Sequence, residues 1–322
     1  MSHAGVSRWT DLGGPVHYLD YGGPESGPVI VGVHGLGGAA LNWSAIAPLL
    51  TGSCRLLAPD LAGHGLTRSA GRGTSVARNR LLLHQFLQAV PGTPVILLGN
   101  SMGGMISLLE AAAEPAAVAG LILVDPALPL VPVRPNTTVM AMFALQALPG
   151  VGRAMIRRNT RRWSPEQLVA GTLALCCSDP ARVPVEIVAA HVAQARQRAE
   201  FTGTDREFAD AARSVVATAA YFRGLRYRRG LGRLTCPVLL IHGEADRLVP
   251  VAAARMLARL NPSWSLVTMP GIGHVPQLEA PADTAAAITA WLGSAGSAAA
   301  AAATRGERPR AAAEAPGEGP AR

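Results

Sequence analysis

The stretch VILLGNSMGGM, residues 95–105, decides the fold class of this chain of 322 residues. Its apolar run 95–98 predicts a buried strand, and residues 102–114 predict a helix. Between them, residues 99–103 fit the pattern G-x-S-x-G, which belongs to a tight strand-to-helix turn that exposes a serine hydroxyl above a sheet edge. We therefore expect an α/β protein with Ser101 at the carboxyl end of a strand.

The small residues beside Ser101 favour a nucleophile over a chance match in a glycine-rich chain. Gly99 and Gly103 leave room for neighbouring backbone, so the turn can hold the serine in a strained conformation. The helix that follows aims its first N–H groups and its positive dipole end at the same place. Such a helix start can stabilise an oxyanion that forms on a substrate.

Short apolar runs alternate with helical stretches along most of the chain. Runs that are apolar throughout suit parallel strands covered by helices on both faces. The expected strands are residues 16–21, 29–33, 55–59, 95–98, 121–124, 238–241 and 266–269. The expected helices are residues 41–50, 75–90, 102–114, 251–260 and 284–292. This order predicts an α/β architecture with a mostly parallel sheet.

Two segments interrupt this alternation. Residues 127–230 contain helical stretches and no convincing strand, which predicts a helical insertion. Residues 293–322 are mainly Ala, Gly, Pro, Glu and Arg with almost no large apolar side chain. Such a composition buries too little surface to offset the entropy of ordering, so we expect a disordered, low-complexity tail.

A serine hydroxyl needs a base, and histidine suits that role near neutral pH. His274 lies in GIGH, residues 271–274, between the last apolar run and the final helix, where its loop can reach the carboxyl edge of the sheet. The acid that orients the imidazole is expected to be Asp246, after the penultimate strand. Asp125 also ends a strand and is the rival, whereas Glu244 lies in a tighter turn.

These segments resemble the α/β-hydrolase family, in its cap-bearing esterase, lipase and carbon–carbon-bond hydrolase branch. The motifs that carry the resemblance are HGLGG at 34–38, DLAGHG at 60–65, the GNSMGG turn, the Asp246 loop and Gly273-His274. The resemblance implies an α/β-hydrolase core over residues 1–126 and 231–292. It also implies that the insertion is a helical cap after the sixth strand of the fold.

The resemblance also assigns roles around Ser101. The residue after the His-Gly pair and the residue after the nucleophile supply the oxyanion-hole N–H groups in the family, which falls on Leu36 and Met102 here. His34 and His64 are interpreted as loop-positioning residues. The serine at position 101 differs from the aspartate nucleophile of haloalkane dehalogenases and epoxide hydrolases.

The expected function is a serine hydrolase that cleaves carboxylic esters of small or lipid-like substrates through a Ser101-His274-Asp246 triad and an acyl-enzyme. The GNSMGG turn is similar to that of meta-cleavage-product hydrolases, although those usually have Ser and Gly-Pro where this chain has Leu36-Gly37-Gly38. Carbon–carbon-bond hydrolysis, cofactor-free perhydrolysis and a non-catalytic binding role therefore remain alternatives.

Composition limits the other classes. With 49% hydrophobic and 16% charged residues, the chain can bury a core. No window holds twenty apolar residues and the first thirty lack a secretory pattern, so a cytoplasmic protein is expected. The four cysteines form neither a disulfide scaffold nor a zinc cluster. We expect no metal or organic cofactor, since no zinc spacing, phosphate loop or dinucleotide fingerprint occurs, and no nucleic-acid partner.

All 29 basic residues are arginine, and their excess lies in the insertion, where residues 127–230 hold fifteen Arg against seven acidic residues. Around residues 153–163 the pattern predicts a short amphipathic helix with a cationic face, opposite Met155, Ile156 and Trp163. The face consists of Arg153, Arg157, Arg158, Arg161 and Arg162. It is either a solvated surface or a contact for anionic groups, which leaves peripheral binding to an anionic membrane open.

Overall fold

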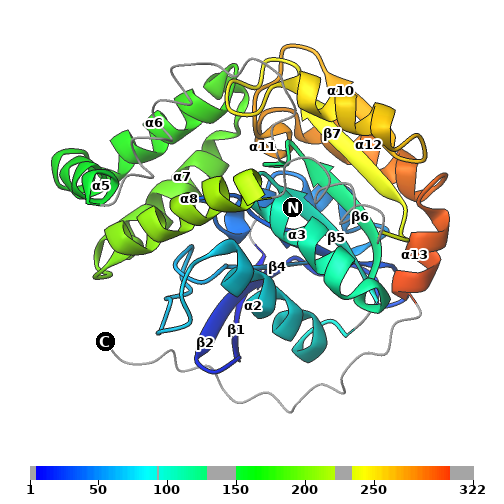
Figure 1. The fold of residues 1–322 in the computed structure, drawn as a ribbon, viewed down its shortest axis with the longest axis horizontal. Helices are drawn as coiled ribbons and strands as arrows, with labels where there is room; N and C mark the ends of the chain where they lie inside the picture. Colours follow the sequence, from blue (N-terminus) through cyan, green and yellow to red (C-terminus); the bar gives the residue numbers. More distant parts are fainter. Residues whose placement is uncertain (1–4, 93, 129–149, 222–233, 305–322) are drawn as a thin grey trace.

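The computed structural model describes residues 5–92, 94–128, 150–221 and 234–304. Its centre is one eight-stranded sheet in the order β1-β2-β4-β3-β5-β6-β7-β8. The strands are β1 (Val6–Asp11), β2 (Pro15–Asp20), β3 (Val29–Val33), β4 (Arg55–Pro59), β5 (Val95–Asn100), β6 (Val118–Val124), β7 (Val238–Gly243) and β8 (Ser265–Met269). The sheet is mostly parallel and lies between helices, as the alternation of strands and helices predicted (Figure 1).

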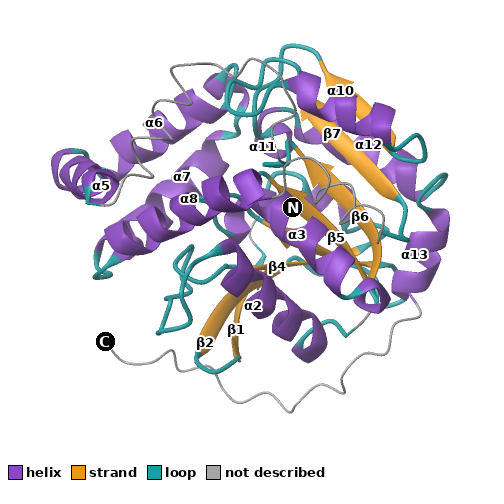
Figure 2. Ribbon diagram, viewed as in Figure 1, coloured by secondary structure: helices purple, strands orange, loops and turns teal. Residues whose placement is uncertain are grey.

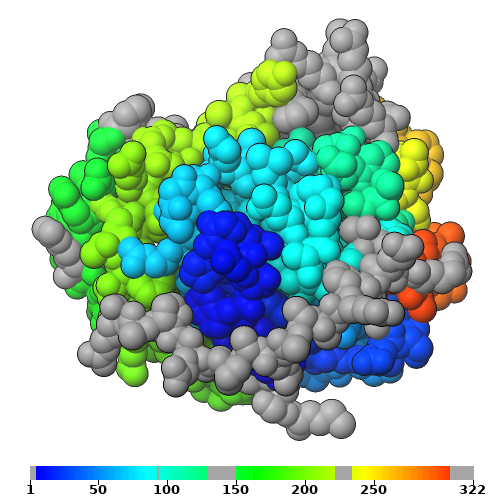
Figure 3. All heavy atoms as spheres, turned by 90° about the horizontal axis from the view of Figure 1, so that it is seen from below, coloured from blue at the N-terminus to red at the C-terminus, as the bar shows by residue number. Residues whose placement is uncertain are grey.

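Only the first two strands run antiparallel to their neighbours. β1 pairs with β2, and β2 pairs with β4, both in antiparallel register, whereas every later pair is parallel. The edge strand β1 was not predicted from the sequence. Its residues are exposed or half-buried at the edge of the sheet, so no buried apolar run marks the strand (Figure 3). Charged and polar residues on such an edge oppose pairing with other chains.

Helices cover both faces of the sheet because alternate strand residues point to opposite sides. On one face Val31, Leu97 and Leu123 pack with α2 (Val76–Ala89), α3 (Met102–Ala113) and α10 (Val251–Leu260). On the other, Ile30, Ile96 and Ile122 pack with α1 (Ala47–Leu50), α12 (Pro281–Leu292) and α13 (Ser297–Thr304). Strands β3 to β7 are buried between these layers, as their apolar runs predicted, whereas β8 is mostly half-buried.

The expected helix over residues 41–50 is divided in two. A 3₁₀ turn, η1 (Ala40–Trp43), comes first, and α1 follows with a proline in its first turn. Proline at that position needs no N–H partner, which favours a new helix start there.

Between β6 and β7 the described residues of the insertion form helices and short turns (Figure 2). These are α5 (Val151–Arg162), α6 (Pro165–Cys176), η3 (Pro180–Arg182), α7 (Val185–Ala199) and α8 (Thr204–Tyr221). They lie on one side of the sheet, with α5 at the outer edge in Figure 1. Residues 129–149 and 222–233 of the predicted cap lie outside the described residues.

The prediction of a disordered tail over residues 293–322 is wrong for residues 297–304, which form α13. Ala299 and Ala303 are buried against the sheet. The contact is close because Gly120 on β6 lacks a side chain, and a Cβ there would lie 2.8 Å from the Ala299 Cβ. The helix α13 and the sheet thus pack closely through alanine and glycine, without the large apolar side chains that usually form such a contact. The remaining residues, 305–322, lie outside the described part.

Among the described residues, no single helix has both the length and the apolar composition to cross a membrane. The bent pair α12 and α13, with 84° between its helices, satisfies those two criteria only when both are taken together.

Candidate active site

Ser101 lies at the turn between β5 and α3, in the strained geometry that its sequence pattern predicted. Its backbone has φ 54° and ψ −117°, which is unusual for a residue with a side chain. Its N–H donates to the carbonyl of Val124 at 3.0 Å, which ties the turn to the end of β6. Such strain at a turn is typical of functional sites held by the surrounding structure.

Close backbone contacts explain the glycines around this turn. A Cβ at Gly103 would lie 2.0 Å from the carbonyl oxygen of Val33, and one at Gly99 would lie 2.6 Å from the carbonyl oxygen of Gly103. A Cβ at Gly35 would lie 3.1 Å from the Ser101 Cβ. The HGLGG loop therefore passes directly beside the serine.

His274 and Asp246 are brought together, as the sequence analysis expected. His274 Nδ1 lies 2.7 Å from Asp246 Oδ2, and both side chains are buried. The other carboxylate oxygen, Oδ1, accepts the N–H groups of Leu248 at 2.7 Å and Val249 at 3.0 Å. Burial opposes the charge of this carboxylate, but His274 and these donors hold the pKa of Asp246 below its usual range.

A hydrogen bond links the histidine loop to the serine turn. The side-chain amide of Asn100, the residue before Ser101, donates to the carbonyls of His274 and Val124, each at 3.1 Å. The two loops are thus tied together although they are far apart in the sequence. Asn100 could not be identified from the sequence, because its role depends on this long-range contact.

Two more contacts that the sequence analysis missed hold the His274 backbone. The N–H of His274 donates to the carbonyl of Cys176 at the end of α6, at 2.7 Å. The N–H of Gly273 donates to the carboxylate of Glu279 at 2.8 Å, and that buried carboxylate also accepts the N–H groups of Ser178 and Asp179. Glu279 therefore joins the cap to the histidine loop. Its only sequence signal is an acidic residue between apolar neighbours, which is too weak to assign a role.

The two residues expected to form the oxyanion hole both belong to segments that lie next to the serine. Met102 is the first residue of α3, where N–H groups have no partner within the helix. Leu36 follows Gly35, which packs against the Ser101 side chain. The cap covers this loop, because a Cβ at Gly37 would lie 2.9 Å from the ring of Phe208 on α8.

His34 and His64 are buried and hold loops in place. His34 Nε2 accepts the N–H of Leu61 at 3.0 Å, so its Nδ1 carries the proton and donates to the Gly35 carbonyl at 2.8 Å. This hydrogen bonding joins the HGLGG and DLAGHG motifs. Burial, followed by neighbouring charges, lowers the pKa of His64 to about 3. These contacts match the loop-positioning interpretation and do not involve proton transfer.

Neither rival acid is hydrogen-bonded to His274 among the described residues. Glu244 pairs with Arg255 at the surface, 2.6 Å away. Asp125 is fully buried at the end of β6, and its Oδ1 accepts the N–H of Gly243 at 3.0 Å. Among the described residues, His274 Nδ1 has its hydrogen bond to Asp246, not to either rival.

Asp125, His242 and Asp246 form a cluster whose residue types and spacing are compatible with a metal ion. However, His242 Nε2, the atom near both carboxylates, lies 2.8 Å from the carbonyl of Val249. A carbonyl only accepts, so this nitrogen carries a proton and cannot bind a cation. Burial lowers the pKa of His242, which keeps the imidazole neutral. The donor chemistry therefore does not fit a metal site.

A family model described as "Alpha/beta hydrolase family" matches residues 30–287, which reach from β3 to β8 and beyond and include the serine turn and the histidine loop. The chain belongs to the alpha/beta hydrolase family. It is 30% identical to a pimeloyl-[acyl-carrier protein] methyl ester esterase of Aromatoleum aromaticum, over 81% of this chain and 96% of the relative.

Other proteins similar to this chain are named for other substrates. The chain is 26% identical to a 2-hydroxy-6-oxo-6-(2'-aminophenyl)hexa-2,4-dienoic acid hydrolase of Metapseudomonas resinovorans, over 89% of this chain and 91% of the relative. Its fold is similar to that of a bacterial membrane phospholipase A, with a TM-score of 0.70 and 23% identity over 91% and 87% of the two chains. A methyl ester esterase and a dienoic acid hydrolase are thus both among its sequence relatives, while the similarity to the phospholipase concerns the fold alone.

Proposed function

We infer that this alpha/beta hydrolase is a serine hydrolase that cleaves carboxylic esters. Ser101 is the nucleophile, His274 the general base and acid, and Asp246 the carboxylate that orients His274. The observation that carries the proposal is the combined geometry of these residues. Ser101 has a strained backbone, with φ 54°, and lies beside Gly35. His274 Nδ1 lies 2.7 Å from Asp246 Oδ2, and the His274 carbonyl accepts a hydrogen bond from the side-chain amide of Asn100.

The hydrogen bond between His274 and Asp246 fixes the imidazole tautomer. Nδ1 carries the proton that binds Asp246 Oδ2, which leaves the Nε2 lone pair free to take the proton of the Ser101 hydroxyl. The deprotonated oxygen attacks the ester carbonyl, and the N–H groups of Leu36 and Met102 stabilise the resulting oxyanion. The alcohol leaves with the proton from His274, and water then hydrolyses the acyl-enzyme by the same route.

The relatives support the ester over other bonds. The most complete match among those described above, 96% of its length at 30% identity, is to a methyl ester esterase. Carbon–carbon-bond hydrolysis is the second candidate, favoured by the similarity to the hexadienoic acid hydrolase and by the GNSMGG turn. Both reactions use the same activated serine, so the substrate that fits beneath the cap decides between them.

Product analysis on two substrate sets tests this proposal. We expect the wild-type protein to hydrolyse p-nitrophenyl esters of increasing acyl length with a clear preference for one length, and to leave a vinylogous diketone intact. EDTA is expected to leave the rate unchanged, because every step uses groups of the chain. Cleavage of the diketone with no turnover of any ester would replace the proposal by carbon–carbon-bond hydrolysis.

A further inference from the structure

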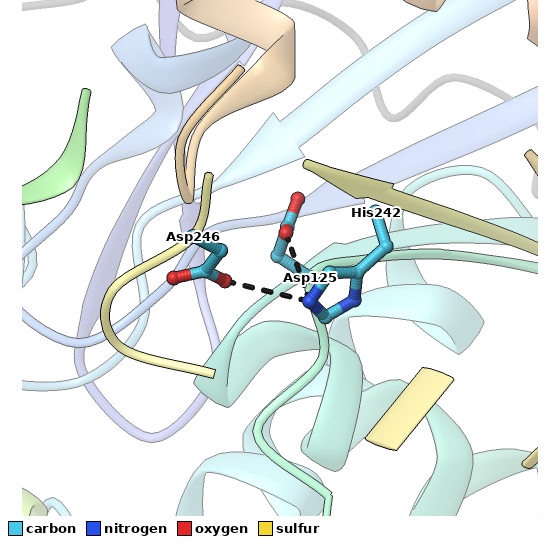
Figure 4. A group of neighbouring side chains, drawn as sticks. All are labelled: Asp125, His242 and Asp246. Carbon is cyan, nitrogen blue, oxygen red and sulfur yellow. Dashed lines mark ion pairs between the residues drawn. The ribbon is translucent and has the colours of Figure 1, made fainter. Parts of the chain in front are cut away.

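Two buried carboxylic side chains lie next to each other behind His274. Asp125 follows β6 and Asp246 follows β7, and one oxygen of each lies within 4.8 Å of the other and of a nitrogen of His242 (Figure 4). Asp125 is fully buried and adopts φ 43°, a conformation rare for a residue with a side chain. The mechanism above uses Asp246 and leaves Asp125 without a role.

Two carboxylates this close, away from water, do not both carry a charge. His242 supplies no compensating charge, because its Nε2 donates to the Val249 carbonyl and its buried Nδ1 has no acceptor among the described residues for a second proton. One of the two acids must therefore be protonated. The carboxylate that stays charged is the one that accepts more hydrogen bonds from N–H donors.

The hydrogen bonds assign the charge to Asp246. Its oxygens accept from two backbone N–H groups and from His274, all at 3.0 Å or less. Asp125 accepts only the N–H of Gly243, at Oδ1, and its buried Oδ2 has no hydrogen-bond donor among the described residues. An oxygen without an N–H donor is the natural place for the proton.

We propose that Asp125 is a neutral carboxylic acid that donates a hydrogen bond through its protonated oxygen to Asp246 and thereby positions the charged partner of His274. This inference rests on the proposed function. Burial, and then the charge of Asp246, raise the pKa of Asp125 well above its usual range. The titratable groups that face Asp125 are Asp246, His242, Glu279 and, through Asp246, His274.

The proton on Asp125 is then required for activity, because it forms the hydrogen bond to Asp246. At high pH its loss would place a second negative charge beside Asp246 and remove the hydrogen bond. The wild-type enzyme is therefore expected to lose kcat on an alkaline limb that comes from this group. Asparagine at position 125 cannot ionise, yet its oxygen can still accept from Gly243 and its amide can donate to Asp246. Asparagine also tolerates positive φ.

The test compares two variants. Asp125→Ala removes the donor and is expected to lower kcat about 10- to 100-fold, the usual range for a lost hydrogen bond to a charged group, with KM little changed. Asp125→Asn is expected to rescue most of that loss and to abolish the alkaline limb. A thermal melt of each variant shows whether the fold is kept. An Asp125→Asn variant that loses as much activity as Asp125→Ala, or keeps the alkaline limb, would overturn the proposal.

A second readout does not depend on turnover. Infrared difference spectra at neutral pH are expected to show the C=O stretch of a buried protonated carboxylic acid in the wild-type protein and not in Asp125→Asn. Asp11→Asn, which changes an exposed side chain bound to the Gly14 N–H, is the matched control and is expected to keep the band. No such band in the wild-type protein would refute the proton on Asp125, whether or not the protein proves to be an esterase.

Discussion

At the scale of single residues, Asp246 carries the charge beside His274. Asp246→Asn replaces the carboxylate by an amide that cannot stabilise the imidazolium or fix its tautomer. We expect kcat on the preferred ester to fall by roughly 10⁴-fold, as for another triad aspartate, and the fold to remain. Steady-state kinetics on the purified variant measure this loss.

The same kinetics on Asp125→Asn provide the comparison. That variant is expected to lose far less than Asp246→Asn, because it keeps the hydrogen bonds of a neutral side chain. The reverse ranking would assign the role of the triad acid to Asp125, at the end of β6. The assignment of Ser101 as the nucleophile does not depend on this ranking.

The motifs were sufficient to propose Ser101, His274 and Asp246 as site residues, because each follows a strand end within a local pattern. Asn100, Glu279 and the hydrogen bond from His274 to Cys176 could not be predicted. Their partners lie on other elements, and a lone Asn or Glu in a sequence gives no sign of which backbone group it will bind. The protonated state inferred for Asp125 could not be predicted for the same reason, since it depends on a neighbour more than a hundred residues away in the sequence.

At the scale of elements, α5 keeps part of the cationic face expected from its sequence. Arg153 pairs with Asp205 of α8 at 2.9 Å, which removes it from that face. Arg157, Arg158 and Arg162 are exposed and line an open cavity of about 310 Å³, and among the described residues none of them has an acidic partner within 4 Å. The Arg161 side chain lies outside the described part.

The apolar side of α5 differs from the expectation at one residue. Met155 and Ile156 are half-buried, but Trp163 is 43% exposed at the end of the helix. An exposed tryptophan beside unpaired arginines is a combination found at membrane surfaces, where amphipathic rings sit at the headgroup level.

We expect the triple change of Arg157, Arg158 and Arg162 to Gln to weaken binding to vesicles that contain anionic lipid. Basic residues near such a surface contribute about 1 kcal/mol each, so the partition coefficient is expected to fall roughly 100-fold at low salt. Salt screens this attraction, so the difference is expected to shrink as ionic strength rises. Vesicle sedimentation at two salt concentrations measures both effects.

A matched control removes the same charge elsewhere. Arg8, Arg78 and Arg259 are exposed on other elements, and their triple change to Gln is expected to leave binding close to the wild-type level. Equal binding by the wild-type protein and the α5 variant would leave this face as a solvated surface. Hydrolysis of a small neutral ester is expected to change little in either variant.

The helix α13 packs on the sheet although its composition predicted disorder. Ala299→Asp places a carboxylate against Gly120 and the sheet, where it has no room and no water. We expect the free energy of unfolding to fall by at least about 2 kcal/mol, the usual order for burying an uncompensated polar group. Ala301→Asp lies two residues along on the exposed side and is expected to change it far less. Similar losses in chemical denaturation would mean that α13 is not packed on the sheet.

At the scale of the whole molecule, buried neutral histidines make the fold sensitive to acid. Burial lowers the pKa values of His34, His64, His191 and His242, that of His64 to about 3. In the unfolded chain a histidine takes up a proton below about pH 6.5. Below that pH the unfolded state therefore binds more protons than the folded state, so stability falls as the pH falls.

For His64 the loss extends from about pH 6.5 down to about pH 3, at up to about 1.4 kcal/mol per pH unit. We expect the free energy of unfolding in urea to be lower at pH 5.0 than at pH 7.5, and the difference to shrink by about 2 kcal/mol in His64→Gln. The same pH dependence in both proteins would show that His64 is not held neutral by the fold.

The topology of the sheet brings the parts of the site together. β5 lies between β3 and β6, and β7 follows β6, so the loops that carry Gly35, Ser101, Asp125 and Asp246 meet at one edge. The sequence could predict the parallel strands from their apolar runs. It could not predict β1 or the packing of the alanine helix α13, because neither has a buried run of large apolar residues.

The central claim is that Ser101 is the nucleophile, and comparing Ser101→Ala with Ser107→Ala tests it most directly. Ser107 lies six residues along on α3, buried, and its hydroxyl has no hydrogen-bond partner among the described residues, so its loss is expected to be mild. We expect Ser101→Ala to lose about 10⁶-fold in kcat on the preferred ester and all labelling by a fluorophosphonate, while Ser107→Ala retains both. An Ser101→Ala protein that keeps more than a few per cent of wild-type turnover, or that the probe still labels, would contradict the account.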